Sequence, residues 1–214
     1  LARALAGKPD VLLLDEPFSG LDEELREDMR ALVLRLHEEL GTTSIQVTHD
    51  ATEALMMSDR IMYMTDGRIV QTATPVELYR HPATLEVATC TGSCSTVSGT
   101  IAHGVFGAGG LAIPLAAAGT ASALGDGDTA VAVLRHEALS ACAGDTFLVE
   151  SCQYRGGAYV AYVLLADGQK LALGTDAPIE PGARIGVQTK PEAVFVYPAS
   201  SSASSRQSFG KTGA

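Results

Sequence analysis

Basic residues are scarce in this sequence, and those present are scattered. The 214-residue chain has 15 lysines and arginines against 25 aspartates and glutamates, which gives a formal net charge of −10. Binding to nucleic acid requires a basic face that neutralises phosphates, and no cluster of lysine or arginine supplies one. The composition therefore argues against nucleic acid as a partner.

Long apolar runs are also missing. No stretch approaches the roughly 18 apolar residues that a membrane-spanning helix needs. Leu1 is not followed by the basic region and apolar core that mark a signal peptide. We therefore expect a soluble chain, whose hydrophobic content of 46% is ample for one large or two small cores.

Cysteine and histidine form no familiar metal-binding pattern. A single Cys-x3-Cys pair without nearby histidines is poor spacing for zinc, and His103, His136 and Cys142 match no known site. Free thiols in a reducing cytoplasm are the expected state. The four cysteines are Cys90, Cys94, Cys142 and Cys152.

The most informative stretch is residues 11–17. Four consecutive aliphatic residues are followed by Asp15, Glu16 and Pro17. Such a run predicts a strand buried on both faces of a parallel sheet. Its two acids then lie at the carboxyl edge, where α/β folds bind ligands, and they suit a hydrated magnesium ion and a water that must lose a proton.

A second strand with polar residues at its end follows nearby. Apolar residues at helical spacing over 21–40 predict an amphipathic helix capped by Asp22 and ended by Gly41. Residues 44–48 then predict a strand that ends in His49 and Asp50. The order of strand, acidic pair, helix, strand and histidine is far more specific than the acidic pair alone.

At these residues the sequence resembles the ATPase subunits of ATP-binding cassette (ABC) transporters. Residues 11–16 look like the Walker B strand, 19–22 like the D-loop, and His49 like the switch histidine. The resemblance implies that Asp15 holds Mg²⁺, that Glu16 is the general base, and that His49 contacts the γ-phosphate of ATP. It also implies cofactor-binding roles for Ser19 and Asp22, although Asp22 is explained equally well as a helix cap.

Three motifs of that family are missing from the sequence. No Gly-x4-Gly-Lys-Ser/Thr follows a strand, and neither the glutamine loop nor the LSGGQ signature is present. Gly210-Lys211-Thr212 is interpreted as coincidence because no strand precedes it. Residues 1–6 look like the last turns of a helix, so we expect that Leu1 is not a natural start and that the chain alone is inactive.

Downstream of the second strand, turn signals divide the chain into short elements. Asp66-Gly67 between alternating runs predicts a hairpin, and 75–80 predicts a helix with proline in its first turn. From Thr89 the composition changes to glycine, alanine, serine and threonine with short strand-like runs, which predicts a small barrel. The predicted strands are 99–102, 129–134, 147–154, 159–165, 170–173, 184–189 and 193–197.

Residues 144–197 resemble the TOBE module, an oligomer-binding-type (OB-like) barrel. Leu165-Ala166-Asp167-Gly168, Pro181-Gly182 and 190–194 carry this resemblance. The expected fold is the C-terminal half of an α/β P-loop NTPase-type nucleotide-binding domain followed by a small all-β barrel. The expected domains are 1–88 for the ATPase part, 89–198 for the barrel and 199–214 for a disordered tail.

The resemblance implies an ATP-hydrolysing subunit that couples hydrolysis to solute import. Its implied cofactors are ATP and Mg²⁺, and its implied partners are a second ATPase subunit and transmembrane permease subunits, at the cytoplasmic face of the inner membrane. A non-catalytic protein in which the barrel senses a ligand is the alternative. The solute cannot be read from the sequence.

Overall fold

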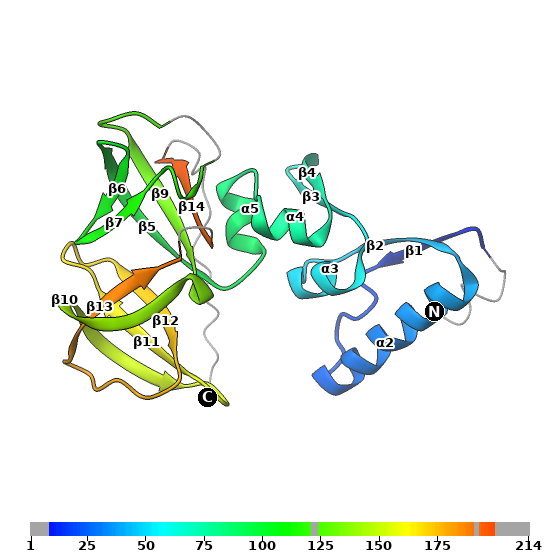
Figure 1. Cartoon of the computed structure of the whole chain (residues 1–214). Coiled ribbons are helices and arrows are strands. Elements are labelled where there is room, and N and C mark those ends of the chain that lie inside the picture. The colour runs from blue at the N-terminus through cyan, green and yellow to red at the C-terminus, as the bar shows by residue number, and fades with distance from the viewer. Residues whose placement is uncertain (1–8, 121–123, 191–192, 200–214) are drawn as a thin grey trace. The chain divides into compact units, whose positions relative to one another are not determined.

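The computed structural model describes residues 9–120, 124–190 and 193–199. The chain forms two compact units, Leu1–Val76 and Glu77–Ala214, shown in Figure 1. The predicted helix end at 1–6 lies outside the described residues. So do Gly210-Lys211-Thr212 and the predicted tail, apart from Ala199.

The first unit has the mixed α/β character that the sequence predicted. The predicted helix over 21–40 is observed from Glu23, because Asp22 caps it by accepting a hydrogen bond from the Leu25 N–H at 2.9 Å. Its elements are β1 (Val11–Asp15), α2 (Glu23–Leu40), β2 (Thr43–Val47), α3 (Ala51–Met57), β3 (Ile61–Thr65) and β4 (Arg68–Ala73).

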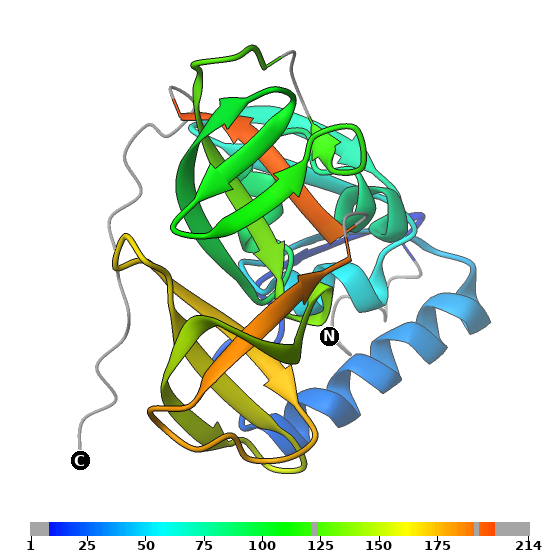
Figure 2. The ribbon, with the colours of Figure 1, turned by 60° about the vertical axis from the view of Figure 1, so that its left-hand side comes forward.

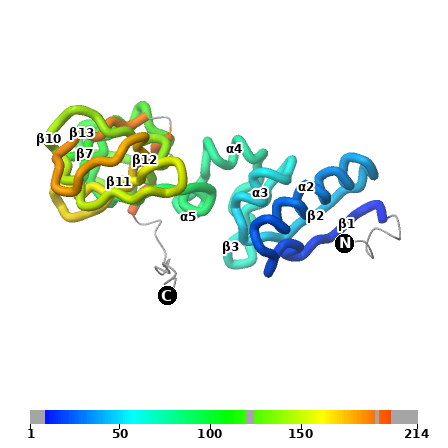
Figure 3. Tube along the Cα trace, turned by 90° about the horizontal axis from the view of Figure 1, so that it is seen from below, coloured from blue at the N-terminus to red at the C-terminus, as the bar shows by residue number. Residues whose placement is uncertain are grey.

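Strands β1 and β2 form a parallel pair that α2 covers on one face only. The register places Leu13 beside Ile45 and Asp15 beside Val47. Leu12 is buried on the face toward α2, which runs alongside the strands in Figure 3. Leu13, by contrast, is 71% exposed. The expectation of a strand buried on both faces is therefore met on one face only among the described residues.

The β3–β4 hairpin confirms the turn predicted from its dipeptide. Asp66 and Gly67 both have positive φ, at 48° and 72°. Two-residue hairpins need this backbone because its twist matches that of the flanking strands. The strands pair from Ile61 opposite Ala73 to Thr65 opposite Arg68.

The second unit consists mostly of antiparallel strands, arranged in a four-stranded and a six-stranded sheet (Figure 2). The sheet orders are β12-β11-β10-β13 and β7-β6-β5-β9-β14-β8. The elements are α4 (Pro75–Arg80, which begins in the first unit), α5 (Leu85–Cys90), β5 (Cys94–Ala102), β6 (Val105–Ala108), β7 (Leu111–Pro114), β8 (Gly119–Thr120), β9 (Thr129–Arg135), the 3₁₀ helix η1 (His136–Ala138), β10 (Leu139–Tyr154), β11 (Tyr159–Leu164), β12 (Lys170–Thr175), β13 (Arg184–Thr189) and β14 (Val194–Pro198).

The two sheets share one hydrophobic core, but the described strands do not form the closed barrel that was expected. Side chains replace a backbone ladder where β5 meets β12. The Gln169 amide accepts from the Ser98 N–H and donates to the Ser98 carbonyl, both at 2.7 Å. The Ala172 N–H donates to the Ser95 hydroxyl at 2.9 Å. These side-chain contacts give backbone groups of β5 and β12 hydrogen-bond partners, while the two strands stay in separate sheets.

The compact second unit begins before Thr89, the boundary expected from composition. Helix α5, which the sequence analysis missed, packs on the six-stranded sheet, because Ala88 is buried in a cluster with Val133 and Phe195. The sequence indicates this helix only weakly, because α5 is short and its residues show no amphipathic pattern. None of the described helices is both long and apolar enough to cross a membrane.

Candidate functional site

The structure brings the expected base and the expected switch histidine together. Glu16 directly follows β1, and His49 lies just beyond β2. Because the two strands are parallel and paired, their carboxyl ends meet at one edge. The His49 Nδ1 lies 2.9 Å from the Glu16 Oε1. When Glu16 is ionised, it can only accept, so Nδ1 carries the proton and Nε2 has no partner among the described residues.

Glu16 has an unusual backbone. Its φ is +43°, in a region that side-chain-bearing residues rarely adopt. Its N–H nevertheless donates to the Val47 carbonyl at 2.9 Å, which continues the β1–β2 ladder for one more residue. Strained backbone of this kind clusters at functional sites and costs on the order of 1–3 kcal/mol. The chain therefore holds Glu16 in a costly conformation at the sheet edge.

The segment between Glu16 and α2 folds as a tight turn. The Ser19 N–H donates to the Glu16 carbonyl at 3.1 Å, and the fully buried Phe18 anchors the turn. Asp22 caps α2 through its carboxylate. The structure thus places Ser19 next to the Glu16 backbone, whereas the Asp22 side chain is committed to the helix N-terminus.

Asp15 is the last residue of β1 and is exposed. The described residues contain no group of three or more histidine, cysteine, aspartate or glutamate side chains that could enclose a metal ion. Mg²⁺ usually keeps several waters and takes only one or two protein carboxylates together with substrate phosphates. An exposed Asp15 beside Glu16 fits that mode of binding and does not fit a metal site made wholly of protein ligands.

Four further residues surround His49, and sequence reasoning had given none of them a role at this site. The Thr48 hydroxyl donates to the Glu53 carboxylate at 2.7 Å and accepts from the Asp50 N–H at 3.0 Å. Arg30 on α2 lies 3.4 Å from Glu53 and 3.7 Å from Asp50. The spacing of 23 residues between Arg30 and Glu53 gave no signal, because only the fold brings α2 beside α3.

The surroundings of Asp50 lower the pKa of its carboxyl group. Burial acts to raise its pKa, but hydrogen bonds from the Thr52 and Glu53 N–H groups, followed by the charge of Arg30, lower it below the usual value. Asp50 is therefore ionised at neutral pH and caps α3 as an anion.

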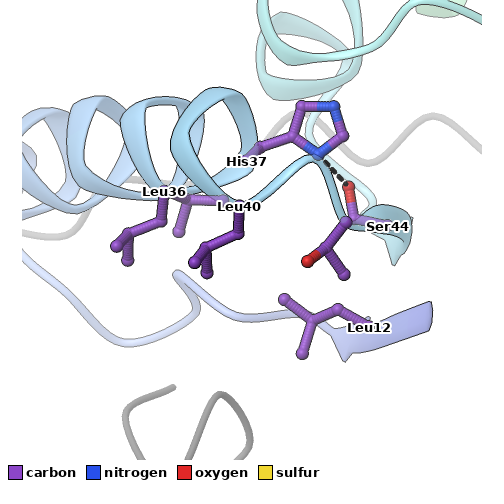
Figure 4. Close-up of a pocket in the computed structure, with 7 residues that line it drawn as sticks. Leu12, Leu36, His37, Leu40 and Ser44 are labelled. Atoms are coloured by element: carbon purple, nitrogen blue, oxygen red, sulfur yellow. Dashed lines mark hydrogen bonds between the residues drawn. The ribbon is translucent and has the colours of Figure 1, made fainter. Parts of the chain in front are cut away.

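The pocket shown in Figure 4 lies away from the sheet edge that carries Glu16. It sits near the amino ends of β1 and β2, where the end of α2 covers them, and its lining is largely apolar. His37 on α2 lines this pocket, with its Nδ1 3.5 Å from the Ser44 hydroxyl. The lining residues are Leu12, Val33, Leu36, His37, Leu40, Thr42 and Ser44.

In the second unit, the four cysteines are free thiols. His103 lies 3.8 Å from Asp126 on the surface. Burial lowers the pKa of His136. Within the described ranges, these residues belong to no group of three or more histidine, cysteine, aspartate or glutamate side chains that could hold a metal ion.

Curated proteins similar to this chain are named import ATP-binding proteins. The sulfate/thiosulfate import ATP-binding protein CysA of Caulobacter vibrioides is 39% identical over 173 residues, which are 81% of this chain and 49% of the relative. The Fe(3+) ions import ATP-binding protein FbpC 1 of Haemophilus influenzae is 40% identical over 164 residues, 77% of this chain and 49% of the relative. CysA of Mycolicibacterium paratuberculosis is 50% identical over 101 residues, 47% of this chain and 28% of the relative.

No family model matches the chain. The chain spans about half the length of the curated relatives it matches. The 173-residue similarity to the Caulobacter protein is longer than either compact unit, so it includes parts of both. Homologues of the chain are therefore named import ATP-binding proteins, and the similarity to the Caulobacter protein covers parts of both units.

Proposed function

We propose that this chain is part of the ATPase subunit of an ABC importer and carries its water-activating edge. The observation that carries the proposal is the pairing of Glu16 with His49 at the carboxyl ends of two adjacent parallel strands. An acid that can accept a proton and an imidazole that can sense a phosphate are the groups that such hydrolysis requires. The names of the relatives support this assignment.

In this proposal Glu16 takes the proton of the attacking water as it approaches the γ-phosphate of ATP. His49 holds the Glu16 carboxylate through Nδ1 and presents Nε2 to the phosphate oxygens. Asp15 would hold Mg²⁺, which supplies charge neutralisation at the phosphates. Ser19 and Asp22 would lie close to the nucleotide and to a partner subunit.

This sequence contains no glycine-rich loop after a strand that could bind the phosphates of ATP. A Walker A loop binds phosphates with backbone N–H groups and a lysine at a helix N-terminus, and no described segment has that form. The activity proposed here therefore requires additional sequence or a further subunit. We infer that the purified 214-residue chain neither binds ATP tightly nor hydrolyses it.

We propose that the second unit is a TOBE-type, OB-like regulatory domain. Two sheets around one core, with glycine turns at Gly168 and Gly182, support this assignment. The second candidate function, a ligand-sensing module without catalysis, is favoured by one observation, because this unit holds most of the buried core. Substitutions at Glu16 distinguish the two candidates.

The proposed partners are a second ATPase subunit and transmembrane permease subunits, with the protein bound peripherally at the cytoplasmic face of the membrane. The relatives transport different solutes, sulfate or thiosulfate in one case and Fe(3+) in another. The solute of this protein is therefore left open.

The test uses a longer protein that contains this chain together with a phosphate cradle. Glu16→Gln removes the base but keeps a side chain of similar shape, so ATP binding should persist while turnover falls by roughly a hundredfold or more. His49→Ala should act likewise. Glu27→Gln, at an exposed position on α2, is the matched control and should leave turnover unchanged. Normal turnover in both site variants would refute the assignment and favour the sensing module.

A further inference from the structure

The contact between Glu16 and His49 lies in water. The His49 side chain is 76% exposed and the Glu16 side chain 46% exposed. Exposed ion pairs and hydrogen bonds contribute little net stability, because solvent competes for both partners. The contact therefore cannot fix the position of the imidazole by itself, and other groups must hold the segment that carries it.

A side-chain turn encloses the His49 backbone. The Thr48 hydroxyl accepts a hydrogen bond from the Asp50 N–H at 3.0 Å, which closes a short ring with His49 at its centre. The same hydroxyl donates its only proton to the Glu53 carboxylate at 2.7 Å. Glu53 thereby selects the hydroxyl rotamer in which a lone pair faces the Asp50 N–H.

Glu53 is buried and is held by α2. It is 5% exposed, and Arg30, which is 7% exposed, approaches it to 3.4 Å. The same guanidinium lies 3.7 Å from Asp50 and 3.4 Å from Glu23 in the first turn of α2. One buried cation thus lies beside the Glu53 carboxylate, which accepts from Thr48, and the Asp50 carboxylate, which caps α3.

We propose that Thr48, Glu53 and Arg30 are positioning residues that hold His49 against Glu16. The inference deepens the proposed function, because it concerns the same two groups. The buried network supplies the order that the exposed contact lacks. Without it, the His49 turn opens, and the imidazole leaves Glu16 for most of the time.

The decisive variant is Thr48→Val, which has nearly the same shape as threonine but lacks the hydroxyl and leaves the charges in place. Thr48→Ser restores the hydroxyl, and Thr43→Val, at an exposed position on the neighbouring strand β2, is the matched control. Two measurements on the full chain report the turn directly. These are the imidazole NMR signals of His49, assigned by their loss in His49→Gln, and hydrogen exchange at the Asp50 amide.

In Thr48→Val we expect the His49 signals to move toward those of a free imidazole and the Asp50 amide to exchange faster. Thr48→Ser and Thr43→Val should resemble the parent. In the longer protein with a phosphate cradle, Thr48→Val should lower kcat by about 10- to 100-fold, the cost typical of a misplaced group. KM for ATP should stay within about twofold, because ATP binding is expected to persist even when the His49 imidazole is removed.

Unchanged His49 signals and Asp50 exchange in a folded Thr48→Val chain would overturn the inference. If that variant does not fold, the double variant Arg30→Met/Glu53→Gln replaces it, since it removes both buried charges and keeps an amide acceptor for Thr48. Unchanged His49 signals in the double variant would likewise overturn the role of the ion pair. Failure of Glu16→Gln and His49→Ala to slow turnover would refute the proposed function, whereas the NMR and exchange results would still decide the positioning role.

Discussion

The two units bury their apolar residues to different extents. In the first, one face of the β1–β2 pair leaves Val11, Leu13, Ile45 and Val47 between 46% and 71% exposed. In the second, two sheets share a core whose central side chains are fully buried, as Phe106 and Ile113 are. The unit that carries the candidate chemistry is thus the one whose β1–β2 pair is covered on one face only by the residues that the structure describes. Exposed apolar faces of this kind favour association with other protein surfaces.

The largest expected effect of this difference is in limited proteolysis. The second unit satisfies its own strands and core, so a protected fragment should begin near Glu77 and end near Pro198. The first unit should be digested earlier, because local opening exposes less buried surface there. Mass spectrometry of the fragments checks this.

The domain boundary expected from composition predicts a protected fragment that begins near Thr89. The structure moves the expected start because Leu78 and Val87 are buried within the second unit. If residues 9–76 were protected and strands β5–β14 of the second unit were digested, the second unit would not be the more stable of the two.

Removing a core aromatic from the second unit should cost several kcal/mol. The Phe106 ring packs against the backbone of Gly99, where a Cβ would lie 2.7 Å from the ring. Phe106→Ala should lower the free energy of unfolding by about 3–5 kcal/mol, since the cavity cannot collapse between two sheets. Denaturant unfolding of the chain, followed by circular dichroism, measures the loss.

The control for that variant is Leu13→Ala in the first unit. Leu13 is mostly exposed, so its truncation should change the free energy of unfolding by no more than about 0.5 kcal/mol. Equal losses for the two variants would mean that the exposed face is buried in solution.

The second unit also contains a contact of Tyr79 that should make the free energy of unfolding fall at high pH. Arg135 is fully buried with its guanidinium carbon 4.3 Å from the centre of the Tyr79 ring, and the Tyr79 hydroxyl donates to Glu137. Burial first, and then Glu137, raises the pKa of Tyr79 to about 12. An unfolded chain gives up this proton near pH 10. The stabilising effect is therefore complete below about pH 10 and is lost as the pH rises to about 12.

Because Tyr79 is partly exposed, the loss should be only about 1 kcal/mol. It is measured as the difference in unfolding free energy between the parent and Tyr79→Phe at successive pH values. Burial also raises the pKa of Tyr197. Tyr197 is present in both the parent and Tyr79→Phe, so its contribution cancels in the difference. A parent and a variant that lose stability in parallel would contradict the prediction.

Local patterns in the sequence predicted local structure well. The aliphatic run before Asp15, the Asp66-Gly67 turn and the proline at the start of α4 each occur where predicted. Each depends on neighbours within a few residues, so the sequence carries the signal directly. The sequence placed Glu16 and His49 at the ends of two separate strands but did not predict their contact, which arises because the paired parallel strands place their carboxyl ends together.

Features that depend on distant residues could not be predicted. Glu53 and Arg30 meet only because α2 and α3 pack together, and a glutamate in a short helix looks like any exposed acid. The arrangement of two sheets in place of one barrel depends on Gln169 reaching Ser98, a contact between residues 71 positions apart. The residues of the turns do not indicate whether distant strands pair into one closed barrel or into two sheets.

A small effect on stability, together with a clear effect on association, should come from substitutions in the exposed β1–β2 face. Leu13 and Ile45 are paired in register and project to the same side, so they form its centre. Exposed apolar faces of this kind promote self-association. The double substitution Leu13→Thr/Ile45→Thr keeps strand propensity, because threonine is β-branched, and should change the free energy of unfolding by less than about 1 kcal/mol. Sedimentation velocity should then show less oligomer than in the parent at equal concentration. A parent chain that is monomeric throughout, or a variant destabilised as strongly as Phe106→Ala, would show that the face is covered by the chain itself.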